Sequence, residues 1–151
     1  MMPARTEHVR PTDPVRQIMA KLVATVGTGD SLLSVAQELV AGEIGAVVVE
    51  DAQGPTGVIS ERDVVTVVAT RGDVGAQQAG DVMSVDLVVA GPEDSIESVG
   101  RLMRDAGVRH VPIRAGQRLL GLVSIRDVLS VLLPRSPEDS GEDSGRQQDR
   151  A

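Results

Sequence analysis

The sequence contains no phenylalanine, tyrosine, tryptophan or cysteine. Without cysteine, disulfides and thiolate metal sites are excluded, and two histidines (His8 and His110) are too few to predict a histidine-based metal cluster. Without aromatic rings, the chain lacks the side chains on which single-stranded nucleic acid normally stacks. A formal net charge of −7 also disfavours a phosphate backbone as a partner. We therefore expect no metal, no cofactor and no nucleic-acid partner.

Long apolar runs are missing as well. The first eight residues contain no apolar core of a signal peptide, and no stretch approaches the ~18 apolar residues of a membrane span. We therefore expect a soluble, cytoplasmic protein without a membrane partner. Its 151 residues suffice for one domain, or for two small halves that share a core. That core has to be built from Val, Leu, Ile, Ala and Met.

The chain repeats itself at an offset of 64 residues, without a gap between residues 15 and 133. Identical residues recur with the same internal spacings, which indicates an internal duplication. The aligned pairs include Met19 and Met83, Asp30 and Asp94, Ser31 and Ser95, Val35 and Val99, Gly57 and Gly121, Ser60 and Ser124, Arg62 and Arg126, and Asp63 and Asp127.

Each copy has the pattern β-α-β-β-α. A methionine-containing turn comes first, followed by a brief extended segment, an amphipathic helix, two strands and a last helix. Asp30 or Ser31 is the expected cap of the first amphipathic helix, and Asp94 with Glu97 forms the expected cap pair of the second. The expected ranges are 15–19, 23–26, 32–40, 46–50, 58–60 and 61–70 in the first copy, and 79–83, 87–90, 96–103, 110–114, 119–124 and 125–133 in the second.

The predicted fold class is therefore α/β (α+β), with two β-α-β-β-α repeats packed by pseudo-twofold symmetry. The two copies have to pack together, because one unit of ~60 residues buries too little surface alone. The expected organisation is a flexible tail at 1–14, repeat 1 at 15–71, a linker at 72–78, repeat 2 at 79–133 and a disordered acidic tail at 134–151.

The best-matched stretches are residues 57–63 and 121–127, where a strand ends and a Ser-x-x-Asp helix start follows. In a structural interpretation, each pair is a capping box, with Ser bound to the third amide and Asp reaching back. In a functional interpretation, Ser60 and Ser124 donate to a phosphate at the helix amino end, and Asp63 and Asp127 accept from two ribose hydroxyls. Arg62 and Arg126 would then neutralise phosphate charge. The recurrence of all these residues favours the functional interpretation without excluding the structural one.

The pattern Gly-hydrophobic-hydrophobic-Ser-x-x-Asp, present twice, resembles a tandem cystathionine-beta-synthase (CBS) domain pair, or Bateman module. The resemblance covers residues 15–133 and includes the Met19 and Met83 turns and residues 109–112. It implies a non-enzymatic regulatory module of the stand-alone bacterial type. Such a module binds AMP, ADP, ATP or S-adenosylmethionine in clefts between the copies, forms a homodimer and acts on an effector partner that the sequence does not identify.

Carried over by position, the resemblance implies two separate sites in which Asp63 and Asp127 hold ribose. Ser60, Ser124, Arg62 and Arg126 would face phosphate. The starts of the middle strands would face the adenine edge, and the early extended segments would line the other side; the candidates are Ile44, Val47, Val108, His110, Val111 and Pro112, with Thr25 and Val89 opposite. The copies differ at two equivalent positions: repeat 1 has Val48 where repeat 2 has Pro112, and repeat 2 has Val89 where repeat 1 has Thr25. Two unequal sites are expected.

Two other functions remain open. A ligand-free homodimeric scaffold would keep the same fold without using its pockets. An enzymatic function has little support from the sequence. The only lysine, Lys21, does not lie in a Walker-type phosphate loop, and the two histidines do not belong to a Ser-His-Asp set with convincing spacing. His110 and Lys21 are each open to a structural or a phosphate-binding role.

Overall fold

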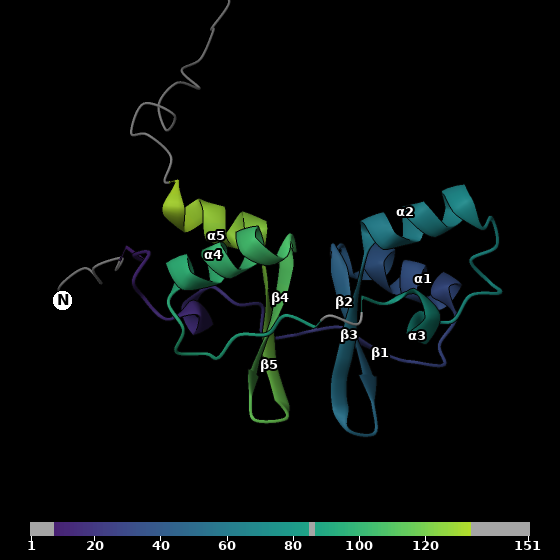
Figure 1. The fold of residues 1–151 in the computed structure, drawn as a ribbon, viewed down its shortest axis with the longest axis horizontal. Coiled ribbons are helices and arrows are strands. Elements are labelled where there is room, and N and C mark those ends of the chain that lie inside the picture. Colours follow the sequence, from purple (N-terminus) through teal and green to yellow (C-terminus); the bar gives the residue numbers. More distant parts are fainter. Residues whose placement is uncertain (1–7, 85–86, 134–151) are drawn as a thin grey trace, which may run out of the picture.

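Two β-hairpins lie at the centre of the molecule, and helices flank them on either side (Figure 1). The computed structural model describes residues 8–84 and 87–133. Repeat 1 holds η1 (Val15–Gln17), β1 (Thr25–Gly27), α1 (Leu32–Gly42), β2 (Ala46–Asp51), β3 (Gly54–Ser60) and α2 (Glu61–Thr70). Repeat 2 holds α3 (Ala79–Val82), α4 (Ile96–Ala106), β4 (His110–Ala115), β5 (Arg118–Ser124) and α5 (Ile125–Leu132). None of the helices in these residues is both long and apolar enough to cross a lipid bilayer.

The mixed α/β fold class and the duplicated arrangement are confirmed. The repeats differ in their parallel strand pairing, which is shorter in repeat 2. In repeat 1, β1 pairs in parallel with β2, and β2 pairs antiparallel with β3. In the described part of repeat 2, β4 and β5 form a hairpin, and the predicted strand at 87–90 is reduced to one bridge between Ala90 and Ile113. Prolines stand at both ends of the shortened ladder, Pro112 in place of Val48 and Pro92 in place of Thr28. Val48 donates its N–H to Ala24 O at 3.1 Å, whereas Pro112, at the equivalent position, has no N–H to donate.

The amphipathic helices are capped by serines. Ser31 accepts from the N–H of Ser34 at the start of α1, and Ser95 accepts from the N–H of Ser98 at the start of α4. The predicted cap pair of Asp94 with Glu97 is therefore wrong. Asp94 lies one residue too early, and its carboxylate accepts instead from the N–H of Gly91 at 2.8 Å, which closes the preceding turn.

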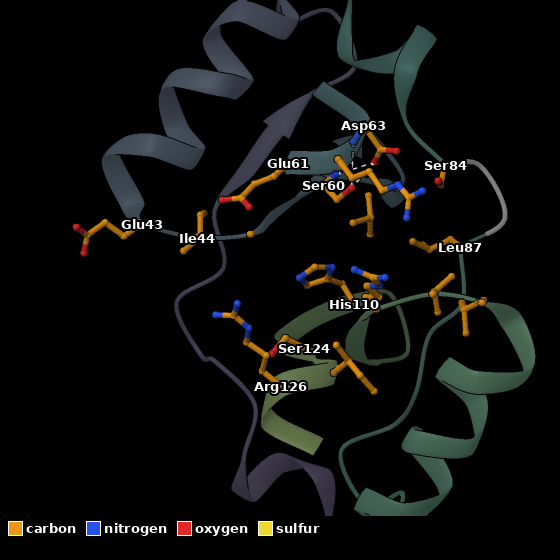
Figure 2. A pocket seen from close by; sticks show the side chains of 18 residues that line it. Glu43, Ile44, Ser60, Glu61, Asp63, Ser84, Leu87, His110, Ser124 and Arg126 are labelled. Carbon is orange, nitrogen blue, oxygen red and sulfur yellow. Dashed lines mark hydrogen bonds between the residues drawn. The ribbon is translucent and has the colours of Figure 1, made fainter. Parts of the chain in front are cut away.

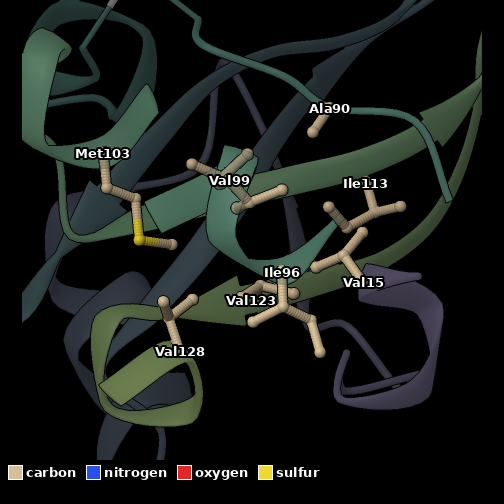
Figure 3. Packing of buried hydrophobic residues seen from close by; sticks show 9 residues of the cluster. Val15, Ala90, Ile96, Val99, Met103, Ile113, Val123 and Val128 are labelled. Carbon is tan, nitrogen blue, oxygen red and sulfur yellow. The ribbon is translucent and has the colours of Figure 1, made fainter. Parts of the chain in front are cut away.

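Each repeat contributes its opening segment to the core of the other. Val15 is fully buried in the core of repeat 2, and Ala79 is fully buried in the core of repeat 1 (Figure 3 shows the former). Their backbones also form hydrogen bonds with the other repeat: Val15 N–H donates to Asp94 O at 2.7 Å, and Ala79 N–H donates to Asp30 O at 2.8 Å. The copies are thus joined by a reciprocal exchange, and neither core is complete without residues from both repeats.

Because of this exchange, the packed part of the chain begins before Val15, earlier than the sequence predicts. Ile96 N–H donates to Asp13 O at 3.0 Å, and Glu97 N–H donates to Pro11 O at 2.9 Å. Residues 11–14 therefore pack on repeat 2 instead of belonging to a flexible tail. The remainder of the predicted tails, 1–7 and 134–151, lies outside the described residues.

The repeated methionines and glycines meet where the exchanged segments cross the hairpins. Ala20 bridges to Leu122 of β5, and Ser84 bridges to Val58 of β3. A Cβ atom on Gly57 would lie 2.6 Å from Met83 Sδ, and one on Gly121 would lie 2.7 Å from Met19 Sδ. Both glycines are therefore required for close approach, which explains their recurrence at the offset of 64.

Candidate functional site

Both Ser-x-x-Asp turns are complete capping boxes. Asp63 N–H donates to Ser60 Oγ at 3.3 Å, and Asp63 Oδ2 accepts from Ser60 N–H at 2.8 Å and from Ser60 Oγ at 3.0 Å. Ser124 and Asp127 repeat the same three contacts, in the same order, at 3.3, 3.0 and 2.9 Å. The structural interpretation of the motif is therefore confirmed. In each box, one carboxylate oxygen is engaged by the serine and Oδ1 has no hydrogen-bond partner within the described part of the chain.

The amino ends of α2 and α5 are partly satisfied by the chain itself. Glu61 N–H donates to Gly45 O at 3.0 Å, and Ile125 N–H donates to Arg109 O at 2.8 Å. The third amide of each helix is bound to the capping serine. Of the first three amides, only those of Arg62 and Arg126 lack a partner among the described residues, so each helix end offers one amide to a ligand instead of three.

A cavity of about 650 Å³ lies between the two repeats and brings both capping turns together (Figure 2). Repeat 1 supplies the ends of α1 and β3 and the start of α2. Repeat 2 supplies the segment before α4, the start of β4 and the start of α5. The lining residues are Glu43, Ile44, Gly45, Val58, Ser60, Glu61, Arg62, Asp63, Ser84, Leu87, Val88, Gly107, Val108, Arg109, His110, Ser124, Ile125 and Arg126.

Eight of the predicted site residues line this cavity: Ile44, Ser60, Arg62, Asp63, Val108, His110, Ser124 and Arg126. Six do not: Thr25, Val47, Val89, Val111, Pro112 and Asp127. Val47 and Val111 alternate inward on their strands and are fully buried in the two cores, so their side chains do not face a ligand. The two Ser-Arg turns, expected in separate sites, share one space, and that space includes Asp63 without Asp127.

The predicted site residues missed several lining residues, of which Glu43, Glu61 and Arg109 carry charge. All three are immediate neighbours of predicted residues in the sequence, so a wider use of the same motifs would have included them. Glu43 also has a left-handed backbone, with φ of 50°, at the position where repeat 2 has Gly107 at 68°. A left-handed non-glycine residue costs about 1 kcal/mol and is often found at functional sites.

His110 projects from the start of β4 into the cavity toward repeat 1 (Figure 2). Burial lowers its pKa below the ordinary 6.5, and the nearby Asp127 and Glu61 carboxylates only partly oppose that effect. His110 is therefore neutral near pH 7 in the unliganded protein. No group of three or more His, Asp or Glu side chains that could hold a metal is found in residues 8–84 and 87–133.

Comparisons with known proteins agree with this architecture. The family model described as CBS domain matches residues 9–70 and 79–134. The CBS domain-containing protein YhcV of Bacillus subtilis is 28% identical over 114 residues, which cover 76% of this chain and 81% of that protein. Several other curated relatives are longer, and the chain spans 35–61% of their length.

Solved structures show the same fold. A CBS-domain-containing protein from Agrobacterium tumefaciens has a TM-score of 0.72 at 33% identity, covering 80% of this chain and 99% of that one. The CBS domain pair of protein MJ0100, solved in complex with 5′-methylthioadenosine and S-adenosyl-L-methionine, has a TM-score of 0.74 at 19% identity, covering 81% and 97%.

Proposed function

The chain belongs to the CBS-domain family, and from that premise we propose that it is a regulatory module that binds an adenosine-containing ligand in the cavity between its two repeats. The candidate ligands are AMP, ADP, ATP and S-adenosylmethionine. Binding would change the shape or the rigidity of the pair, and an effector partner would respond to that change. A ligand shifts such an equilibrium only by the difference in its affinity for the two states.

The observation that carries the proposal is the composition of the cavity. Its volume of about 650 Å³ lies within the range of ligand pockets, ~300–1,000 Å³. Ile44, Val108, Leu87 and Val88 provide aliphatic surface for a flat base, which matters in a chain without aromatic rings. Asp63 provides a carboxylate whose free Oδ1 suits a pair of ribose hydroxyls.

The fold comparison supports the adenosine part of the ligand. The MJ0100 pair was solved with 5′-methylthioadenosine and S-adenosyl-L-methionine, two compounds that share the 5′-methylthioadenosine portion and hence the adenine and the ribose. We infer by analogy that the nucleoside is also the common part of any ligand here. A regulatory role agrees with relatives such as YhcV, which is named for its CBS domains and of which this chain covers 81%.

The first test is spectroscopic and depends on the absence of Trp and Tyr from the sequence. A chain without Trp or Tyr absorbs very little at 280 nm, so a 260 nm band in purified protein would reveal a nucleotide that accompanies it. Mass spectrometry of the released compound would identify that nucleotide and exclude contaminating nucleic acid. Calorimetry of the stripped protein with AMP, ATP and S-adenosylmethionine completes the test. Failure of all adenosine compounds to bind would refute the proposal.

The alternative is a ligand-free homodimeric scaffold, and one observation supports the homodimer that this alternative shares with the regulatory module. Helices α1 and α2 leave valine and leucine side chains exposed: Leu33 at 45%, Val40 at 79%, Val65 at 65% and Val68 at 54%. A second copy of the chain would cover these positions in a homodimer. The scaffold predicts a dimer whose stability does not respond to any nucleotide, whereas the regulatory module predicts a dimer that nucleotide stabilises.

A further inference from the structure

The composition of the chain makes methionine its most readily oxidised side chain. The sequence has five methionines and no cysteine, tryptophan or tyrosine. A peroxide converts the thioether of methionine into a sulfoxide, which turns a flexible apolar side chain into a polar one with a hydrogen-bond acceptor. What this change does to the protein depends on where each methionine lies.

Two methionines lie where the exchanged segments cross the hairpins, and a third lies inside a core. Met103 is 1% exposed among the buried residues of repeat 2 (Figure 3). Met19 and Met83 are half-buried, and each packs on the core of the opposite repeat, Met19 on that of repeat 2 and Met83 on that of repeat 1. An oxidant in solution therefore reaches Met19 and Met83 before Met103.

The sulfur atoms of Met19 and Met83 lie directly against the backbone of the opposite hairpin. The Cβ position on Gly121 is 2.7 Å from Met19 Sδ, and the Cβ position on Gly57 is 2.6 Å from Met83 Sδ. Such close packing leaves no space beside the glycine for an added oxygen, so a sulfoxide has to turn away from the strand or displace it. Oxidation therefore acts on the contacts that join the two repeats.

A hydroxyl group lies next to the sulfur of Met83. Thr56 Oγ1 donates to Val49 O at 3.3 Å and lies 3.7 Å from Met83 Sδ. A threonine hydroxyl rotates about its C–O bond, so its proton can turn from the carbonyl to a sulfoxide oxygen on Met83. A sulfoxide at this position is thus hydrogen-bonded, which offsets the cost of its polarity.

The surroundings of Met19 differ at the same point. In repeat 2, Leu120 stands at the position of Thr56 and has no hydroxyl to donate. The polar atom closest to this contact is an acceptor, because Ala20 O also lies 2.7 Å from the Cβ position on Gly121. A second acceptor beside that carbonyl is repelled, and a polar group without a partner in a packed contact is destabilising.

We propose that Met19 is a site of oxidation by hydrogen peroxide and that its sulfoxide loosens residues 15–20 from repeat 2. Met83 is a second oxidation site, whose sulfoxide Thr56 accommodates. Peroxide transfers one oxygen atom to Sδ: its O–O bond breaks, an S–O bond forms, the sulfur is oxidised by two electrons, and the peroxide is reduced to water. Methionine sulfoxide reductases reverse the step. Because the loosened segment carries the buried Val15, its release opens the core of repeat 2. This inference does not depend on a ligand in the cavity.

Peptide mapping by mass spectrometry after graded treatment of the full chain with hydrogen peroxide measures oxidation at each methionine. We expect Met19 and Met83 to be oxidised at least about tenfold faster than Met103 in the folded protein, and all three at similar rates in urea. Met1 and Met2 are present in every variant, so their oxidation contributes equally to each comparison.

Urea unfolding and amide hydrogen exchange measure the consequence. Peroxide should lower the ratio of folded to unfolded wild type about tenfold, and it should accelerate exchange of the Val15 and Ala20 amides, which donate to repeat 2. Met19→Leu conserves volume and should remove most of this loss, whereas Met83→Leu should not. In the Met19→Leu background, Thr56→Val should bring the loss back, because the sulfoxide of Met83 then lacks its donor.

The oxidised wild type supplies a test that needs no variant, since treatment with a methionine sulfoxide reductase should restore its urea midpoint. Oxidation of Met103 as fast as that of Met19 would overturn the proposal. Unchanged unfolding of a chain that is fully oxidised at Met19 would overturn it as well, as would an equal loss in Met19→Leu and wild type. If Thr56→Val does not bring the loss back, the role given to Thr56 is wrong.

Discussion

The side chain of His110 in repeat 2 reaches the backbone of Gly45 in repeat 1, so closely that a Cβ atom on Gly45 would lie 3.3 Å from His110 Nε2. At the equivalent positions in the other direction stand Arg109 and Ala46, so no histidine is matched with a glycine there. The contact thus breaks the pseudo-twofold symmetry at the centre of the cavity. A side chain at Gly45 would require the His110 imidazole to move by a few tenths of an ångström.

Replacing Asp63 should affect ligand binding more than replacing Asp127. Asp63→Asn and Asp127→Asn both keep an oxygen that accepts from the capping serine, so both helices remain capped. Asp63→Asn removes the charged acceptor from the cavity lining, and loss of hydrogen bonds to a charged group costs about 1.5–3 kcal/mol, or roughly tenfold to a hundredfold in affinity. Calorimetry with AMP measures the effect. Equal losses in the two variants would contradict a site built around Asp63.

Alanine at Gly121 should destabilise the protein more than alanine at Gly57. The new Cβ would lie 2.7 Å from the backbone oxygen of Ala20 in Gly121→Ala, whereas in Gly57→Ala its three nearest atoms all belong to the flexible side chain of Met83. Overpacking of this kind costs about 1–3 kcal/mol, and Gly121→Ala should fall at the upper end. Urea unfolding followed by far-ultraviolet circular dichroism suits a chain without aromatic residues. The opposite order would show that the crossing segment of repeat 1 moves more easily than that of repeat 2.

His110 should make the unliganded protein less stable in mild acid. Burial lowers its pKa in the folded state below 6.5, despite the carboxylates of Asp127, Glu61 and Asp63 and with the help of Arg109. The unfolded chain therefore binds this proton first as the pH falls, and the stability that is fully present above about pH 6.5 is progressively lost below it.

The measurement is the free energy of urea unfolding between about pH 7.5 and about pH 5.5, for wild type and His110→Gln. The wild type should lose more stability than the variant over this interval. Parallel pH profiles would show that His110 does not titrate differently in the two states.

Charge placed on the exposed face of α1 or α2 should separate a homodimer into monomers. Val40 and Val65 are 79% and 65% exposed, and a glutamate at either position would be desolvated in an interface between copies. Light scattering at a series of concentrations should show a dimer for wild type and a monomer for Val40→Glu and Val65→Glu. Leu22→Glu is the control, because Leu22 is 98% exposed and lies outside these helices. A monomeric wild type would contradict the predicted assembly.

Much of the fold was predictable because its determinants are local. Ser60 and Asp63 are three residues apart, so the capping box that starts α2 can be identified in the sequence and recurs at Ser124 and Asp127. The two helices that follow these boxes start at the predicted residues. The error at Asp94 is also local, since aspartate and serine stand side by side and both are good caps.

The parallel pairing of residues 87–90 with β4 is shortened at prolines that are visible in the sequence, but the β-α-β-β-α pattern by itself does not predict this loss. Pro112 stands where repeat 1 has Val48, but the consequence depends on which carbonyl would have accepted the missing N–H. That partner belongs to a segment more than 20 residues earlier in the chain. The backbone pairing therefore emerges only when the two segments are placed together.

The sequence by itself determined that the chain is a duplication, where each helix begins and where the two Ser-x-x-Asp capping boxes lie, because these features depend on residues a few positions apart or on their recurrence. Only the tertiary structure decided that the opening segments exchange cores and that both capping turns share one cavity. It also showed that the charged side chains lining this cavity differ between the two repeats. Those properties depend on contacts between residues far apart in the sequence, such as Ala79 with Asp30 and Val15 with Asp94, and the packing of the two cores brings these residues together.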